Sequence, residues 1–235
     1  DAIRYGIAAA LPETHDADWN WAEFIGRNNN ELVAAWGNLV YRVLSFALKQ
    51  GFTTVPTPGT LTAEDQAILA QSEAAFETVG GLLAAVKIRA ALNEAMALVR
   101  DTNAYLDKRA PWKRIKADRA DTGTALYTVL RVIDNLKILL APFVPFSAQR
   151  LHGYLGYDGQ LFGHQSIVTY RESTRDHDGL VYDASTALGH WEPSRLAPGQ
   201  ALRTPEPLFK KLGKDTAEEN AIIAAERARL GQPVA

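Results

Sequence analysis

Two short stretches of the chain carry the side chains best suited to binding chemistry. Asn38 and Arg42 stand four residues apart in a segment with helical periodicity, and this spacing places an amide beside a guanidinium on one helix face. Further along, Ala110-Pro111-Trp112 puts an indole directly after a proline that fixes the backbone. An exposed indole can stack an unpaired base, and an amide beside a guanidinium can read a base edge.

Basic residues surround this indole. Residues 108–119 include six basic side chains and one acidic side chain, a local charge of +5 in a chain whose formal net charge is −2. Any contact with nucleic acid is therefore expected from this local patch rather than from a global basic field. Lys113 and Arg114 follow Trp112 directly, and their charges make them candidates for phosphate contacts.

Both patterns also have a purely structural explanation. A polar helix face that carries Asn38 and Arg42 is most often a solvated surface, and so is a cluster of charges. Trp112 can fold back into the core in spite of its charged neighbours. An asparagine in mid-helix is mildly unfavourable, because its amide competes for backbone hydrogen bonds, and this favours a binding role for Asn38.

The chain has no motif that indicates catalysis or metal binding. It contains no cysteine, which excludes disulfides and thiolate zinc sites, and its histidines are scattered rather than paired at ligand spacing. No Gly-x-Ser-x-Gly elbow, Walker loop or Gly-x-Gly-x-x-Gly turn is present. We therefore predict no catalytic residue, no metal ligand and no nucleotide-binding loop. No apolar run approaches ~18 residues, so no membrane span is predicted.

Apolar residues recur at intervals of three and four, which predicts helices. The connections between them are short, which is typical of an all-α antiparallel bundle. We expect a kink or break at Gly80-Gly81, because glycine weakens a helix interior. The expected helices cover residues 1–11, 19–50, 62–80, 82–107, 119–141 and 146–155.

Local features refine these boundaries. Asp18 is a candidate N-cap for the first long helix, and Thr62 with Asp65 forms a Thr-x-x-acid start related to the capping box. Gly37 is expected to allow a close helix approach. The composition changes after Gly156.

The remaining residues follow three patterns. Residues 157–201 have no sustained period and predict an irregular extension. Residues 202–212 are expected to dock as an extended segment on another part of the protein. Residues 216–230 are expected to form a final helix.

Several stretches together resemble one family. The chain opens with Asp-Ala-Ile-Arg-Tyr, and residues 37–46 are Gly-Asn-Leu-Val-Tyr-Arg-Val-Leu-Ser-Phe. The other matching stretches are Asn-Glu-Leu-Val at 30–33, Asn-Ala-Tyr-Leu at 103–106, Ala-Pro-Trp at 110–112 and the stretch 139–146, with its prolines and phenylalanines. In combination they resemble the helical, C-terminal anticodon-binding half of the methionyl-tRNA synthetase family over residues 1–155.

This resemblance implies roles for individual residues. Trp112 would stack on the first anticodon base, and Pro111 would shape the same wall. Asn38 and Arg42 would form hydrogen bonds with anticodon base edges. The phosphate contacts of Lys113 and Arg114 are inferred from charge and not from the family motif.

The resemblance also implies an organisation and partners. Residues 1–17 would end the linking, stem-contact region, 18–156 would be the helical anticodon-binding domain, 157–201 an irregular extension, and 202–235 a docking segment with a C-terminal helix. The expected partners are tRNA(Met) and the catalytic domain of the same polypeptide. The protein is expected to be a cytoplasmic monomer that does not contact a membrane.

The chain departs from the family in one important respect. The His-Ile-Gly-His and Lys-Met-Ser-Lys-Ser signatures of the catalytic domain are absent. The only methionine is Met96, and the chain opens with residues of helical character, so we interpret it as a fragment of a longer polypeptide. We expect no cofactor in this fragment, whereas ATP and magnesium would serve the full ligase.

Three alternatives remain at this stage. The chain could be the anticodon domain of a related class I synthetase, for valine, isoleucine, leucine or cysteine. It could be a free-standing or split-subunit tRNA-binding module. It could also be a helical interaction protein without any role in RNA binding.

Overall fold

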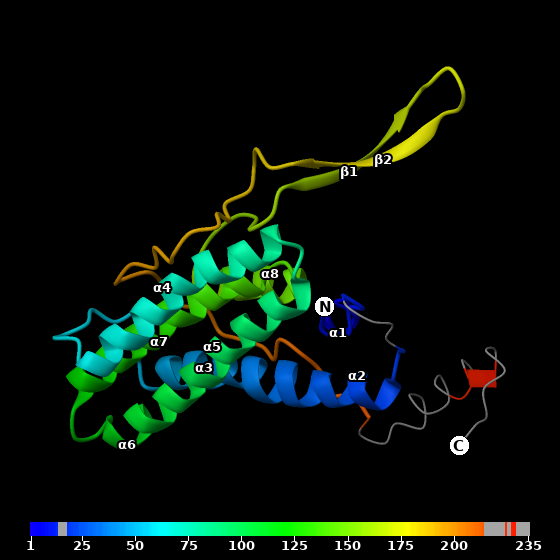
Figure 1. Ribbon diagram of the computed structural model, residues 1–235. Coiled ribbons are helices and arrows are strands. Elements are labelled where there is room, and N and C mark those ends of the chain that lie inside the picture. The colour runs from blue at the N-terminus through cyan, green and yellow to red at the C-terminus, as the bar shows by residue number, and fades with distance from the viewer. Residues whose placement is uncertain (14–17, 214–223, 225–226, 229–235) are drawn as a thin grey trace.

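A computed structural model describes residues 1–13, 18–213, 224, 227 and 228. The predicted helical bundle is confirmed, and a small antiparallel sheet projects from it (Figure 1). The helices are α1 (Ala2–Ala9), α2 (Trp21–Arg27), the π-helical η1 (Asn28–Gly37), α3 (Asn38–Lys49), α4 (Ala63–Ala84), α5 (Ile88–Arg109), α6 (Pro111–Arg114), α7 (Arg119–Leu140) and α8 (Pro145–Tyr154). The strands are β1 (His164–Tyr170) and β2 (His177–Asp183).

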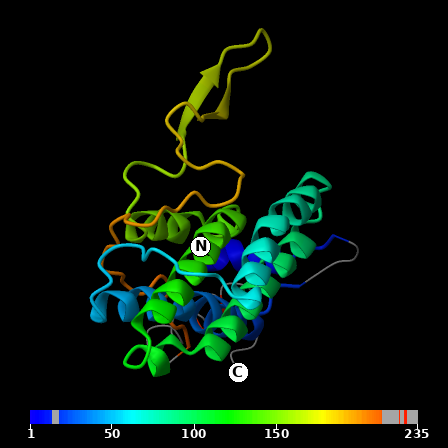
Figure 2. The same ribbon diagram turned by 90° about the vertical axis from the view of Figure 1, so that its left-hand side faces the viewer.

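The core lies between α4, α5 and α7, which run side by side, and the long α2–η1–α3 helix, which crosses them (Figures 1 and 2). Helix α7 is the central element, because Leu126, Leu130 and Ile133 are completely buried. Burying such side chains stabilises the fold by about 1.5–3 kcal/mol each. Among the described residues, no helix has the length and apolar character needed to cross a membrane.

Two helix starts test the predicted capping. Asp18 is not the cap of the first long helix; Asn20 is, because its side chain accepts hydrogen bonds from the backbone N–H groups of Ala22 (2.9 Å) and Glu23 (3.2 Å). The predicted start at Thr62 is confirmed. The Thr62 hydroxyl accepts from the N–H of Asp65, and the Asp65 carboxylate accepts from the N–H of Thr62.

The predicted break at Gly80-Gly81 is wrong. Both glycines lie inside α4, and the chain turns at residues 85–87, where Val86 has φ 58°. The indole of Trp191 explains why residue 80 is a glycine, because a Cβ at position 80 would lie 2.8 Å from the ring nitrogen of Trp191. That nitrogen donates a hydrogen bond to the carbonyl of Phe76 (3.0 Å). Gly80 therefore makes room for an indole from a distant segment.

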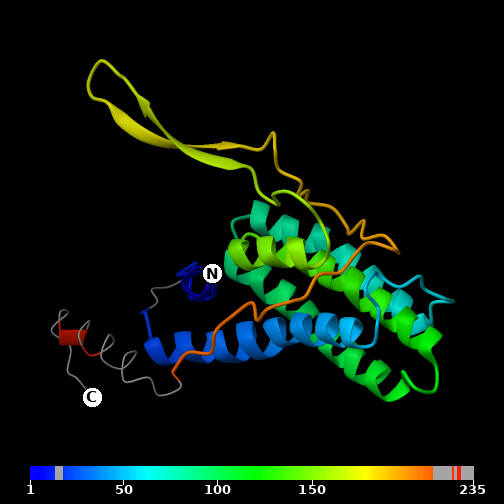
Figure 3. The same ribbon diagram turned by 180° about the vertical axis from the view of Figure 1, so that it is seen from behind.

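The predicted helix over 19–50 is present, but its central part is π-helical. Gly37, at the end of η1, is approached by the ring of Phe209 rather than by another helix. A Cβ there would lie 2.9 Å from the Leu32 carbonyl oxygen of the same helix and 3.2 Å from that ring. The side chains of Asn28 and Asn29 donate to the carbonyls of Lys210 (3.0 Å) and Leu212 (2.7 Å). The segment 202–212 therefore lies along this helix, as Figure 3 shows.

An all-α fold is wrong for residues 164–183. They form an antiparallel hairpin in which Ile167 pairs with Leu180 and His164 with Asp183. Its side chains are mostly exposed, so no alternating buried face marks the strands in the sequence. The final helix predicted for 216–230 falls on residues that the structure describes only at 224, 227 and 228.

Candidate nucleic-acid interface

A sharp corner between α5 and α6 presents Trp112. Helix α5 ends at Arg109, and Ala110 adopts the left-handed conformation (φ 40°, ψ 58°). Pro111 then starts α6, where its fixed φ suits the first helical position and its missing N–H removes no helical bond. A left-handed alanine costs about 1–2 kcal/mol, so the surrounding contacts must hold this corner in place.

The corner brings Trp112 against Arg42. The guanidinium carbon of Arg42 lies 4.9 Å from the centroid of the Trp112 ring, within the range of a cation–π contact. The indole is partly buried and packs on the edge of the core. It is thus neither free in solvent nor folded into the interior, so its position is fixed while part of its surface stays accessible.

Two residues of α5 orient Arg42. Its terminal nitrogens bond to the carboxylate of Asp107 (3.2 Å) and the amide oxygen of Asn103 (3.3 Å). Asn103 is itself fixed, because its amide nitrogen donates to the carbonyls of Ala35 and Val99. Sequence reasoning missed this clamp, although Asn103 and Asp107 stand four residues apart and therefore share a helix face.

Asn38 lies one helical turn before Arg42, at the start of α3. It is exposed, and its side chain has no hydrogen-bond partner among the residues that the structure describes. A separation of four residues corresponds to about 6 Å along a helix. The structure therefore places Arg42 in contact with Trp112, and Asn38 next to Arg42 with its amide free.

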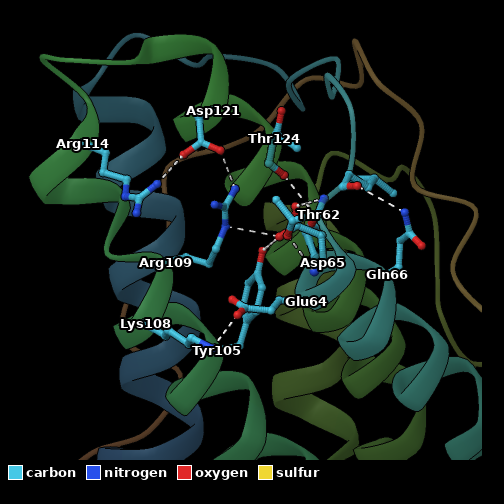
Figure 4. Close-up of polar contacts among 12 residues, drawn as sticks. Thr62, Glu64, Asp65, Gln66, Tyr105, Lys108, Arg109, Arg114, Asp121 and Thr124 are labelled. Atoms are coloured by element: carbon cyan, nitrogen blue, oxygen red, sulfur yellow. Dashed lines mark hydrogen bonds and ion pairs between the residues drawn. The ribbon is translucent and has the colours of Figure 1, made fainter.

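Ion pairs neutralise three of the six cations in the basic stretch, and those of Arg109 are buried (Figure 4). The guanidinium of Arg109 lies 3.2 Å from the carboxylate of Asp65 and donates to that of Asp121 (2.7 Å). The hydroxyl of Tyr105 donates to the same Asp65 carboxylate (2.6 Å). Burial, and then this hydrogen bond, raises the pKa of Tyr105. These contacts join the start of α4, the end of α5 and the start of α7 beneath the corner.

Two further cations of the stretch also have acidic partners. Arg114 is 3.2 Å from the second oxygen of Asp121, and Lys108 pairs with Glu64. Burial opposes the charged form of Asp121, but its two arginine partners outweigh this effect and lower its pKa. Lys113 is exposed and has no acidic partner among the described residues. Of the two predicted phosphate contacts, Lys113 is therefore free and Arg114 is engaged.

A second buried polar cluster fixes the segment that returns from the hairpin. The ammonium of Lys137 lies 2.5 Å from Asp134 and 3.2 Å from Nδ1 of His152. The other Asp134 oxygen accepts hydrogen bonds from Tyr157 (2.8 Å) and Ser194 (2.5 Å). Burial, reinforced by the nearby lysine charge, lowers the pKa of His152 to about 4. Among the described residues, no group of three or more potential ligands could hold a metal ion.

Comparison with known families gives a consistent result. The family model described as the anticodon binding domain of methionyl tRNA ligase matches residues 55–172, and that of class I tRNA synthetases (M) matches residues 1–44. The methionine–tRNA ligase of Chloroflexus aggregans is 50% identical over 98% of this chain, and that of Thermobifida fusca is 40% identical over 98%. The chain spans 38% of the length of these two relatives.

Solved structures give the same result. The apo form of Mycobacterium tuberculosis methionyl-tRNA synthetase matches 91% of this chain with a TM-score of 0.73 and 26% identity; the match covers 39% of that protein. The same enzyme in complex with methionyl-adenylate matches 88% of this chain, over 37% of its own length, with a TM-score of 0.71. The resemblance noted in the sequence is thereby confirmed, and the chain belongs to the methionyl-tRNA ligase family, with the anticodon binding domain of that family at residues 55–172.

Proposed function

We propose that this chain reads the anticodon of tRNA(Met) as part of a methionine–tRNA ligase, which attaches methionine to its tRNA with ATP. The observation that carries the proposal is the contact between Arg42 and Trp112. It joins an aromatic surface, which can stack any base, to a hydrogen-bonding group, which can discriminate among bases.

Recognition uses four side chains. An anticodon base leaves the loop stack and stacks on Trp112, with Pro111 forming the adjacent wall. Asn38 contributes one donor and one acceptor group, and Arg42 contributes the N–H groups that Asp107 and Asn103 do not occupy. A wrong base leaves these groups unpaired, which is the main physical source of discrimination at such a site.

The phosphate contacts follow from the charges that remain unpaired. Lys113 is the stronger candidate, because its ammonium has no acidic partner in the described part of the chain. Arg114 keeps more than half of its side chain exposed, so it can contact a phosphate while it stays bonded to Asp121. Both contacts would weaken as the salt concentration rises.

We assign the ligase chemistry to other parts of the polypeptide. The residues of this chain do not fit a magnesium or ATP site: the sequence contains no phosphate-binding loop, and the described residues lack a cluster of metal ligands. From the chain's membership of the ligase family, we also propose residues 1–17 as the link to the catalytic domain, 18–156 as the anticodon-binding domain, and a cytoplasmic monomer as the working form.

A binding titration tests the proposal. The chain is titrated at fixed salt with an RNA hairpin that carries a CAU anticodon loop, and with a second hairpin in which only the anticodon differs. Trp112→Ala should weaken binding of the CAU hairpin by about 1–3 kcal/mol, roughly 5- to 150-fold. Trp19→Ala is the matched control, since Trp19 is 41% exposed and stands just before α2 in the sequence. Helix α2 lies far from α6 in Figure 1.

The outcomes separate the alternatives. Equal binding of the CAU hairpin by wild type and Trp112→Ala would refute the proposed role of Trp112. Equal affinity of the chain for the two hairpins would refute anticodon recognition. Preference for the anticodon of valine, isoleucine, leucine or cysteine in a panel of tRNAs would refute the proposed recognition of tRNA(Met). No binding to any RNA at low salt would refute RNA recognition by this chain.

A further inference from the structure

A separate cavity opens at the same end of the bundle as the corner. Its volume is about 520 Å³, which falls in the range of pockets that hold small ligands. The loop that follows α3 forms one wall and the first turns of α7 form the other; both lie beside α6 in Figures 1 and 2. Arg119, the first residue of α7, belongs to its lining.

The charge of this cavity is positive. Arg119 is the single charged residue among those that line it, and no carboxylate faces it from the described part of the chain. The guanidinium carbon of Arg119 lies 4.2 Å from the ring centroid of Phe52, and the residue has no ion pair among the described residues. An exposed arginine held by a ring, without an acidic partner, is well placed for a phosphate, which its planar group can bind with two hydrogen bonds.

The walls of the cavity are fixed before any ligand arrives. The N–H of Val55 donates to the carbonyl of Gln200 (2.8 Å), and that of Gly199 donates to Val55 (2.8 Å). The N–H of Leu202 donates to the carbonyl of Thr53 (2.9 Å). Because the return segment holds the loop in this way, a ligand would not have to order it, and a preorganised site loses less free energy on binding.

The cavity and the Trp112 corner are held in one rigid unit. Arg119 stands two residues before Asp121, which bonds to Arg109 at the end of α5 and to Arg114 in α6. Helix α6, which carries Trp112, and the start of α7, which carries Arg119, are therefore fixed relative to each other. A single RNA loop that places one base on Trp112 would bring its neighbouring backbone to this end of the bundle.

We propose that this cavity is a second RNA subsite, in which Arg119 binds a backbone phosphate of the loop that Trp112 reads. The inference rests on the proposed function. It adds a specific phosphate contact at a position outside the basic residues that directly follow Trp112. Its ligand is the phosphodiester of single-stranded RNA rather than a free nucleotide.

Salt-dependent titration of the CAU hairpin tests this subsite. Each phosphate contact to a single strand contributes about 0.7 to the slope of log affinity against log salt concentration. Arg119→Gln should reduce the slope by this amount and weaken binding several-fold at low salt, whereas Arg119→Lys should retain most of the affinity. Arg131→Gln is the matched control, because Arg131 lies three turns further along the same helix and its guanidinium also lies near an aromatic ring, that of Tyr127.

Parallel measurements distinguish this inference from the proposed function. Loss of binding in Trp112→Ala together with wild-type affinity and slope in Arg119→Gln would overturn the subsite alone. Wild-type binding in both variants would overturn the proposed function as well. If cytidine monophosphate bound in an Arg119-dependent manner while hairpin binding did not depend on Arg119, the cavity would be a free-nucleotide site and the subsite would be refuted.

Discussion

Replacing Arg109 with methionine should strongly destabilise the protein. The Arg109 side chain is 7% exposed and its partner Asp65 is 0% exposed, so the substitution leaves a carboxylate in the interior without its cation. Removing one partner of a buried pair costs about 3–5 kcal/mol. Asp65 keeps its hydrogen bonds from Thr62 and Tyr105, and Asp121 keeps Arg114. We therefore expect the free energy of unfolding to fall by an amount near the lower end of this range, about 3 kcal/mol.

A double-mutant cycle separates the buried charge from simple loss of packing. Asp65→Asn keeps the shape of the side chain but removes the charge that Arg109 neutralises. The double variant Asp65→Asn/Arg109→Met should be more stable than the sum of the two single losses predicts, by about 2 kcal/mol, because no unpaired buried carboxylate remains. The assay is urea unfolding monitored by circular dichroism, with equal m-values as the condition for comparison.

Arg131→Met is the control for this cycle. Its guanidinium lies 3.5 Å from Glu73 at a more exposed position, and pairs of this kind contribute about 0–1 kcal/mol. An Arg109→Met variant as stable as this control, or a double variant whose loss equals the sum of the single losses, would refute the reasoning. The corner beneath Trp112 would then owe its geometry to other contacts.

Three further predictions concern the clamp, the buried histidine and the two glycines of α4. Asn103→Ala frees Arg42 and should weaken hairpin binding by about 1 kcal/mol, roughly fivefold, in the same titration. His152 has a pKa of about 4 in the folded protein, below its ordinary 6.5, so the unfolded chain takes up the proton first as the pH falls. The free energy of unfolding, which is highest above pH 6.5, should therefore fall by on the order of 2 kcal/mol as the pH approaches 4. In urea unfolding, His152→Gln should flatten this pH dependence. Gly81→Ala meets nothing within 4 Å and should stabilise the protein by up to about 1 kcal/mol. Gly80→Ala should lose that gain and more, because its Cβ meets the Trp191 ring at 2.8 Å; thermal unfolding of the pair checks the difference.

The contact between Arg42 and Trp112 could be predicted in part, because local rules specify the position of each of the two side chains on its own segment. Helical periodicity placed the guanidinium on a polar face, and a proline before the indole indicated a corner. The family resemblance then connected two segments that lie far apart in the sequence. The partial burial of the indole could not be predicted from these local patterns, because it depends on the packing of α6 against α7.

The sequence of the basic stretch could not predict which of its cations form ion pairs. Their acidic partners Glu64 and Asp65 come from the start of α4, and only the folded bundle brings them to the end of α5. Local charge therefore overestimated the free charge at the corner. The capping motif that predicted the role of Asp65 gave no sign that the same carboxylate also holds Arg109.

Long-range contacts also explain the other errors. Gly80 is required by Trp191, which lies beyond the helical bundle in the sequence, and this requirement has no local signature. At Gly37, a Cβ would meet both the Leu32 carbonyl of the same helix and the distant ring of Phe209. The hairpin at 164–183 was missed for the opposite reason: it buries little, so its strands are specified by backbone pairing and not by an apolar face.

The cations around the corner have two different tasks. Arg109, with its carboxylate partners, lies beneath the turn that presents Trp112, whereas Lys113 and Arg119 have no acidic partner among the described residues and are the cations that we propose for RNA phosphates. The two tasks respond differently to salt. Coulomb attraction by an exposed cation is screened within a Debye length of about 8 Å at physiological ionic strength, while buried pairs are screened much less. On the proposed function, a defect in the buried pairs should displace the indole and weaken base stacking at every salt concentration, whereas the effect of a defect in the exposed cations should become smaller as the salt concentration rises. The presentation of the indole is therefore separable from attraction of the backbone, although both depend on the same short stretch of chain.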